Sequence, residues 1–374
     1  MNKANQIKST KLIPDKKYPS ISGIRAISIV LVIISHLGGF EKYFEINKWL
    51  RPFVYFLEDG QLGVNIFFVI SGFLITTLLL LEEKKTKKIS LKNFYIRRTL
   101  RIFPAFYFLL LVYLILQFIG VLHISNASWL SAVTYTKYFN WELDWPTAHA
   151  WSLSVEEHFY LLWPLIFLCG NRFRKFFAIA LILAVPLVRM YTNAYPVSWI
   201  NFLTIFTRID AIATGCIFAL FRDEIIELFK SRWKLVFYFS VLGLLSLRFL
   251  PALFDKIGAA YIFIPLGITY GTIANFLIGI IIMYSIFGPQ KNWFKFLNLR
   301  IVNYIGILSY SLYLWQQLFL LGKGYWAMQF PQNLFFVFAT AMFSYHFIEK
   351  PFLKLKERFS SQKNKNVAPL TTSV

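Results

Sequence analysis

Charged residues are scarce in this sequence. Of its 374 residues only 15% are charged, whereas 57% are hydrophobic and 41 are phenylalanine. This composition excludes an intrinsically disordered chain and an ordinary soluble domain, and it indicates a polytopic membrane protein. Negatively charged residues are rarer than positively charged ones, with 18 Asp and Glu against 39 Lys and Arg. In a membrane protein such an excess of cations is typical of basic cytoplasmic loops, and we expect no nucleic-acid partner.

Cysteine is also nearly absent. Cys169 and Cys216 both lie in apolar runs and lack the spacing of a zinc site. We therefore interpret them as small buried hydrophobic residues and expect no metal.

The basic N-terminal stretch leads into an apolar run that is too long for a secretory signal and is followed by no small-x-small cleavage site. We expect this segment to be retained.

Ten hydrophobic segments follow the polar N-terminal stretch. We expect each to be a transmembrane helix, which makes the fold all-α and multi-pass. The segments are 22–40, 60–81, 102–122, 151–169, 176–191, 200–221, 233–250, 262–287, 302–321 and 330–348. The eighth is a candidate for a broken helix, because Pro265, Gly267 and Gly271 interrupt it.

The basic residues support this count. With ten spans and both termini in the cytoplasm, thirty of the 39 Lys and Arg fall on the cytoplasmic side and eight on the outer side. This bias follows the positive-inside rule, which an odd number of spans would scramble. We predict one membrane domain over residues 21–352 in the plasma (inner) membrane, between cytoplasmic tails over 1–20 and 353–374.

The first hydrophobic segment carries two ionisable residues, Arg25 and His36. Eleven positions of an α-helix are ~20° more than three turns, so both residues share one face at ~16 Å along the axis. Ionisable groups inside a membrane helix are costly and are usually functional. The alternative is an anchoring arginine and a histidine that reaches the membrane surface.

The predicted topology brings further polar residues into the outer half of the membrane with His36. The fourth segment carries Glu156, and the sixth carries Arg208 and Asp210. The ninth carries a mixed aromatic and amide set, namely Tyr313, Trp315, Gln316 and Gln317. Because uncompensated charges in a membrane are expensive, we expect these side chains to face one another in a shared cavity. A structural ion-pair network that holds the helices together is the alternative.

Three arginines precede the third segment on the predicted cytoplasmic side. Arg101 lies three positions after Arg98 and four after Arg97, so their guanidinium groups cluster on a helical turn. Arginine forks match phosphate oxygens in pairs and therefore predict a phosphate-binding site. Contact with anionic lipid is the alternative.

A single ligand would connect these two features. Arg25 lies toward the arginine cluster and shares a helix face with His36. A molecule with an anionic nucleotide head and a long thin arm would span the two, and coenzyme A has this shape. Its thioester would meet an imidazole, which acts as a general base or as a nucleophile toward an acyl group. Glu156 would orient or stabilise that imidazole, as an acid partner does in a triad.

The chain resembles the acyltransferase-3 family of integral membrane acyltransferases. The family's Arg-x10-His pattern is met by Arg25 and His36, and its Arg-x-x-Arg pattern by Arg98 and Arg101. Further matches occur in family order over residues 21–352, at Phe67–Thr76, Trp151–Glu156, Arg208 with Gly215, Tyr310–Trp315 and Phe347–Phe352.

This resemblance implies transfer of an acyl group, usually acetyl from acetyl-CoA, to a sugar hydroxyl of a cell-envelope polysaccharide or lipid-linked glycan. It makes His36 the catalytic candidate and the arginines donor-site candidates. The sequence departs from the family pattern at Asn65, His158 and Gln316, where Asp, Gln and His are usual, so the acceptor's identity stays open.

The predicted site residues thus form three groups. The catalytic candidates are His36 and Glu156. The acyl-CoA site is assigned to Arg25, Arg97, Arg98 and Arg101. The acceptor site is assigned to Ser71, Arg208, Tyr313, Trp315 and Gln316.

Two other function classes remain open. One is a transporter or a flippase for a lipid-linked sugar, in which His36, Glu156 and Arg208 line an ion or substrate path. The other is a non-catalytic subunit of an envelope-synthesis complex. The expected partners of the enzyme are acyl-CoA, a glycan acceptor and the lipid bilayer, and its oligomeric state is left open.

Overall fold

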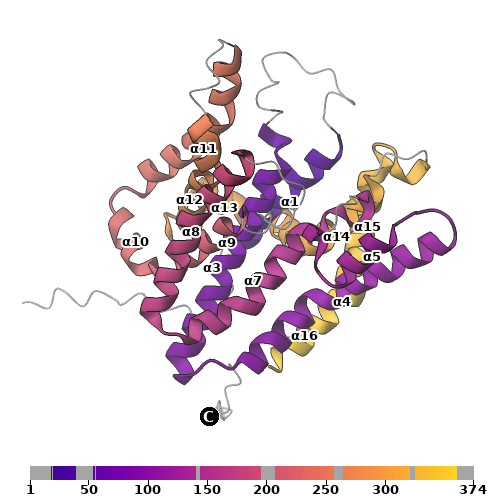
Figure 1. Cartoon of the computed structure of the whole chain (residues 1–374), viewed down its shortest axis with the longest axis horizontal. Helices are drawn as coiled ribbons and strands as arrows, with labels where there is room; N and C mark the ends of the chain where they lie inside the picture. Colours follow the sequence, from indigo (N-terminus) through magenta and orange to yellow (C-terminus); the bar gives the residue numbers. More distant parts are fainter. Residues whose placement is uncertain are drawn as a thin grey trace, which may run out of the picture.

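The computed structural model describes residues 18, 20–38, 54, 56–139, 144–194, 207–256, 264–320 and 325–359. Within these ranges every regular element is a helix (Figure 1), which confirms the all-α prediction for this part of the chain. The longer helices are α1 (Ile21–His36), α3 (Gly60–Thr86), α4 (Leu91–Phe118), α7 (Ala150–Leu168), α8 (Asn171–Ala194), α9 (Ile209–Leu220), α11 (Trp233–Lys256), α12 (Ile264–Phe287), α14 (Arg300–Phe319) and α15 (Gln332–Phe343). The shorter ones are α5 (Asn126–Val133), η2 (Lys137–Phe139), α6 (Trp145–Ala148), α10 (Arg222–Phe229), α13 (Asn292–Leu297), η5 (Trp326–Met328), η6 (Ser344–Glu349) and α16 (Lys350–Glu357).

The described part of each of the ten hydrophobic segments lies mainly on one of the longer helices, while residues 39–40, 200–206, 262–263 and 321 of these segments are outside the described chain. Within the described residues, three helical stretches are long and apolar enough to cross a membrane, namely α3, α4 and the part of α12 from Thr269 to Phe287. Shorter apolar helices include α1, α9 and the first part of α11. These lengths fit a membrane protein, whereas the count of ten spans and the orientation of the termini stay predictions.

Helices α1, α3, α9 and α14 form the centre of the bundle. α3 packs along both α1 and α9, and α1 packs along α14. A Cβ atom at Gly72 would overlap the carbonyl oxygen of Ile212, and one at Gly215 would overlap that of Val69. Close approach of two backbones through small residues is how membrane helices gain packing energy without a hydrophobic driving force. Helix α1 is therefore held inside the bundle, with both of its ends against other elements.

Helix α12 is not broken. It runs as one α-helix from Ile264 to Phe287, so the expectation of an interrupted eighth segment is wrong. Pro265 falls in the first turn, where a missing backbone N–H does no harm. A Cβ atom at Gly271 would lie 3.0 Å from the guanidinium nitrogens of Arg189. This glycine therefore makes room for a side chain of α8.

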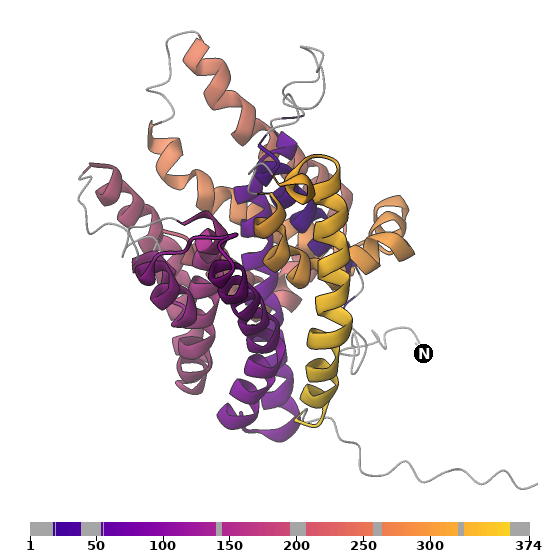
Figure 2. The ribbon, with the colours of Figure 1, turned by 90° about the vertical axis from the view of Figure 1, so that its right-hand side faces the viewer.

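The C-terminal helices α15, η6 and α16 follow one another without a break, and α16 packs along the first turns of α4 (Figures 1 and 2). Nη1 of Arg97 donates to the carbonyl of Phe359 at 2.9 Å, which ties the end of this rod to α4. The predicted tail from residue 353 thus begins inside a helix, while residues 360–374 lie outside the described chain.

Candidate active site

His36 lies at the C-terminal end of α1 and faces α14. Its Nδ1 atom is 2.8 Å from Oε1 of Gln316, a fully buried residue. Nε2 of Gln316 donates to Oε1 of Gln317 at 3.1 Å. Nε2 of Gln317 in turn donates to the carbonyl of Trp145 at 2.9 Å. His36 is thus the end of a relay of two amides that starts at a backbone oxygen.

This relay fixes the tautomer of His36. A backbone carbonyl only accepts hydrogen bonds, so Gln317 must turn its NH2 group toward Trp145 and its oxygen toward Gln316. Gln316 then presents its own oxygen to His36, and Nδ1 of the imidazole carries the proton that it donates. The Nε2 atom of neutral His36 keeps a lone pair, which is the state that a general base or a nucleophile requires.

Aromatic residues complete the surroundings of His36. The Trp145 ring meets the His36 ring edge-on at 5.5 Å between centroids, and its indole N–H donates to the carbonyl of Gln317 at 3.1 Å. The ring of His149 meets that of Tyr313 at 5.5 Å, and the Tyr313 hydroxyl donates to the carbonyl of His149 at 3.0 Å. We call this set the histidine site; its members are His36, Trp145, His149, Tyr313, Gln316 and Gln317.

The sequence predicted part of the histidine site. His36, Tyr313 and Gln316 were expected there and are found together. Trp145 and His149 were missed, because they belong to short α6 and to the turn before α7, just outside the hydrophobic segment that begins at residue 151. The only signal was the aromatic and polar stretch from Trp145 to Trp151 at the edge of that segment.

Glu156 does not join the histidine site. Its Oε1 accepts from the Ser71 hydroxyl at 2.8 Å, and its Oε2 accepts from the Tyr160 hydroxyl at 3.1 Å. The guanidinium of Arg98 lies 4.4 Å from the centre of the Tyr160 ring. The expected pairing of Glu156 with His36 or Arg208 is therefore wrong, since spacing along a helix gives a face and not the partner across from it. Ser71, which was assigned to the acceptor site from the sequence, is thus a hydrogen-bond partner of Glu156.

Glu156 belongs to a second polar group around the predicted donor-site arginines. Arg25 interacts electrostatically with Arg101, Glu349 and Glu156. Arg98 interacts with Arg101, Glu157 and Glu156. We call this set the arginine cluster; its members are Arg25, Arg98, Arg101, Glu156, Glu157, Tyr160 and Glu349. The sequence placed its three arginines together correctly, and the structure adds three glutamates as their acidic neighbours.

Arg97 and Lys356 border the arginine cluster. Arg97 forms an ion pair with Glu82 at 2.7 Å and is also held by the Phe359 carbonyl, so its guanidinium ties α3, α4 and the C-terminal helix together. Lys356 lies on α16, beyond the predicted membrane domain. Burial, together with the positive charges of Arg101, Arg98 and Arg97, lowers the pKa of Lys356 to about 7. This crowding of cations is the condition in which a bound anion is favourable.

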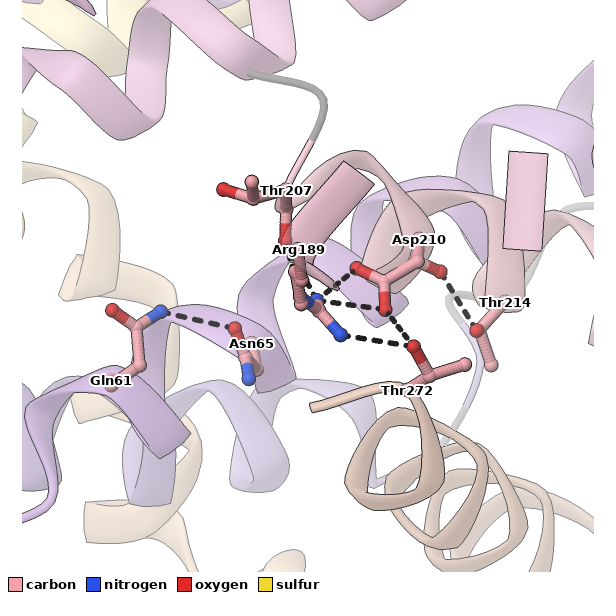
Figure 3. A network of polar contacts seen from close by, with 7 residues as sticks. All are labelled: Gln61, Asn65, Arg189, Thr207, Asp210, Thr214 and Thr272. Carbon is pink, nitrogen blue, oxygen red and sulfur yellow. Dashed lines mark hydrogen bonds and ion pairs between the residues drawn. The ribbon is translucent and has the colours of Figure 1, made fainter. Parts of the chain in front are cut away.

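A third polar group joins α8, α9 and α12 (Figure 3). Nη2 of Arg189 lies 2.9 Å from the fully buried carboxylate of Asp210. The Thr272 hydroxyl donates to that carboxylate at 2.6 Å, and Arg189 donates to the carbonyl of Thr207 at 2.6 Å. Asp210 is thus fully occupied by groups of neighbouring helices. Here the alternative of a structural ion-pair network is the one that the structure shows.

Arg208 stands beside this network without joining it. Its guanidinium makes no hydrogen bond to a described residue, and its electrostatic neighbours are Arg189, Asp210 and Asp59. Asp59 caps α3, accepting from the backbone N–H of Leu62 at 2.9 Å. A Cβ atom at Gly60, the next residue, would meet the side chain of Ser35. Arg208 therefore lies toward the end of the bundle that carries His36.

Trp315 lies apart from both clusters. Its ring contacts Phe108 of α4 at 5.9 Å and lines an apolar groove between α4, α14 and α15. Its neighbour Gln316 points in a different direction, ~100° further around α14, toward His36. The grouping of Trp315 with the acceptor-site residues therefore finds no contact in the described chain.

Known proteins resemble this chain over nearly its whole length. The family model described as an acyltransferase domain matches residues 18–345. O-acetyltransferase OatA of Staphylococcus aureus (strain NCTC 8325 / PS 47) is 31% identical over 373 residues, which cover 92% of this chain and 58% of the relative. A putative O-acetyltransferase of S. aureus strain COL is 30% identical over 374 residues, with 92% and 59% covered.

The chain thus spans less than two thirds of the length of these curated relatives. No solved structure matches it. The family match covers both the helix with Arg25 and His36 and the helices that carry the arginine cluster and the amide relay. The chain belongs to the acyltransferase-3 family.

Proposed function

We propose that the protein is a membrane O-acyltransferase that moves an acyl group, most simply acetyl, from acyl-CoA to a hydroxyl of a cell-envelope glycan. Membership of the family supports acyl transfer, and the names of the relatives support O-acetylation. The observation that carries the proposal is the amide relay, which leaves Nε2 of His36 unprotonated in the neutral side chain.

The arginine cluster supports acyl-CoA as the donor. Its three guanidinium groups are bordered by two further cations, Arg97 and Lys356, and arginine forks match phosphate oxygens. Arg25 belongs to this cluster, and His36 lies ~16 Å away along the same helix face. In the proposal the phosphates of coenzyme A lie at Arg25, Arg98 and Arg101, and the thin arm extends along α1 so that the thioester meets His36.

The proposed transfer uses one base. Nε2 of His36 takes the proton of the acceptor hydroxyl, whose oxygen attacks the thioester carbonyl carbon. The C–S bond breaks, the ester forms, and the coenzyme A sulfur leaves as thiolate and takes the proton from the imidazolium. Gln316 holds Nδ1–H throughout and so keeps the ring in one orientation. Attack by Nε2 itself, through an acyl-histidine, uses the same lone pair.

The proposed topology separates the two substrates. Ten spans with cytoplasmic termini would put the arginine cluster near the cytoplasm, where acyl-CoA is made, and the histidine site toward the outer side, where envelope glycans lie. A transporter or flippase has less support. Its path was to join His36, Glu156 and Arg208, but Glu156 hydrogen-bonds with Ser71 and Tyr160 in a separate cluster.

The test is gain of acetyl groups. The protein is expressed in a bacterium that lacks its own envelope O-acetyltransferases, and base-labile acetate on cell-wall glycans is measured by mass spectrometry. We expect a mass increment of one acetyl group on a glycan of unchanged abundance. An altered amount of glycan without acetylation would instead support export or scaffolding.

A further inference from the structure

The histidine site contains a second histidine for which the proposed transfer has no role. The side chain of His149 is 3% exposed, and neither of its ring nitrogens has a hydrogen-bond partner in the described chain. The backbone of Pro146 is close enough to the ring for a weak hydrogen-bond-like contact, but this contact does not meet the geometry of a full hydrogen bond. Buried polar groups without a partner destabilise a fold, so such a group usually meets a ligand, an ion or a water molecule.

The backbone of His149, unlike its ring, is firmly held. Its carbonyl accepts from the Tyr313 hydroxyl at 3.0 Å, and the Ser152 hydroxyl lies 2.5 Å from that hydroxyl and 3.2 Å from the carbonyl. The ring packs edge-on against Tyr313. Thr147, two residues earlier, is also buried with a hydroxyl that lacks a partner in the described chain. Helix α6 and the turn that links it to α7 thus have a backbone held at His149 and two buried polar side chains, Thr147 and His149, without a partner in the described chain.

This segment belongs to the surroundings of His36. Trp145, the first residue of α6, contacts the His36 ring and holds the amide relay through its carbonyl. His149 and His36 also interact electrostatically. The donor nitrogens of Trp145, Gln316 and Gln317 and the hydroxyl of Tyr313 each bind a protein group already. Among the members of the histidine site, His149 is the one whose donor is not engaged within the described chain.

We propose that His149 is a second catalytic residue, whose ring N–H donates a hydrogen bond to the acyl carbonyl oxygen as that oxygen becomes an oxyanion. Attack on a thioester places negative charge on this oxygen, and a fixed donor in a water-poor site stabilises it strongly. His36 moves the proton of the acceptor, and His149 moves none. This inference rests on the proposed acyltransferase function.

The deciding variant is His149→Phe, which keeps an aromatic ring against Tyr313 and removes both nitrogens. We expect its unfolding temperature to equal or exceed that of the unaltered protein, because an unpaired polar group leaves the interior. Transfer from acetyl-CoA to cell-wall glycan should fall at least tenfold, through kcat, with the affinity for acetyl-CoA unchanged. His149→Gln restores an N–H donor and should recover part of the activity.

His346→Phe is the control. His346 lies on η6 outside the histidine site and the arginine cluster, and its Nε2 is 3.3 Å from the Tyr304 hydroxyl. This variant should keep full transfer. Normal transfer by His149→Phe, or a parallel loss of activity and unfolding temperature in both His149 variants, would overturn the role of His149 alone. Absence of transfer by the unaltered protein would overturn the proposed function as well.

Discussion

Which ring nitrogen of His36 carries the proton is set at the far end of the amide relay, by the carbonyl of Trp145. In a catalytic triad a carboxylate holds the histidine and also stabilises its charged form. Here an amide oxygen holds it, which fixes orientation without adding charge. The histidine therefore gains its tautomer from geometry, and its charged form is stabilised less than it would be beside a carboxylate.

His36→Ala should abolish transfer while the protein remains folded in the membrane. Transfer should be lost because the change removes the Nε2 lone pair that the amide relay leaves free. The fold should survive because the deleted side chain is only partly buried and lies at a helix end. Acetylated glycan and the amount of detergent-extracted, monodisperse protein are measured together. Acetylation at normal protein abundance would remove His36 from the chemistry.

Gln317→Leu tests the relay without touching His36. Loss of the Gln317 amide frees Gln316 to rotate, so that its NH2 group can face Nδ1 and stabilise the wrong tautomer of the imidazole. We expect kcat to fall roughly tenfold to a hundredfold. This is the size of the effect when a residue that orients a metal-binding histidine is replaced in other proteins. The affinity for acetyl-CoA should not change. Unaltered kcat would show that Gln316 keeps its orientation by itself.

At the scale of elements, the network of α8, α9 and α12 serves the fold. Asp210→Ala would leave Arg189 buried without its counter-charge, and breaking such a pair costs about 3–5 kcal/mol. The double change of Asp210→Leu with Arg189→Met removes both charges and should recover much of that loss. Thermal unfolding in detergent compares the two. A single variant as stable as the unaltered protein would contradict this assignment.

If acyl-CoA binds at the arginine cluster as proposed, the packing of α16 on α4 should make its binding sensitive to pH. Lys356, with its pKa lowered to about 7, loses its proton above neutral pH in the free protein, and a bound phosphate would restore it. Binding of acetyl-CoA should therefore take up a proton and weaken as the pH rises from 7 to 9. Calorimetry at several pH values measures this slope. In Lys356→Met the slope should flatten, and an unchanged slope would exclude Lys356.

At the scale of the whole molecule, hydropathy predicted where the long helices lie but not where they end. The described part of each hydrophobic segment lies mainly on a helix, because apolar runs of this length have few other structures. α4 begins at Leu91, well before the predicted start at residue 102, since its first turns are basic and do not register as apolar. The short helices α5, α6 and α13 lie between the segments and carry no periodic signal long enough to detect.

Pairings between helices were the least predictable part of the site. Spacing along one chain correctly put Arg25 and His36 on one face and Arg98 beside Arg101. It gave no information on which helix lies opposite, so Glu156 was paired wrongly and Arg189 was not recognised as the partner of Asp210. The residues of the turn before α7 were missed for the same reason.

The tight seating of α1 has a consequence for substrate choice. Gly306 brings its first turn against α14, and the Ser28 hydroxyl donates to the carbonyl of Gly63 on α3. Because α1 is held rigidly by these contacts, it keeps the arginine cluster and the histidine site at a constant separation. A donor would then be selected by its length. Carriers shorter than the gap would anchor at one end and leave the acyl group short of His36, whatever that group is.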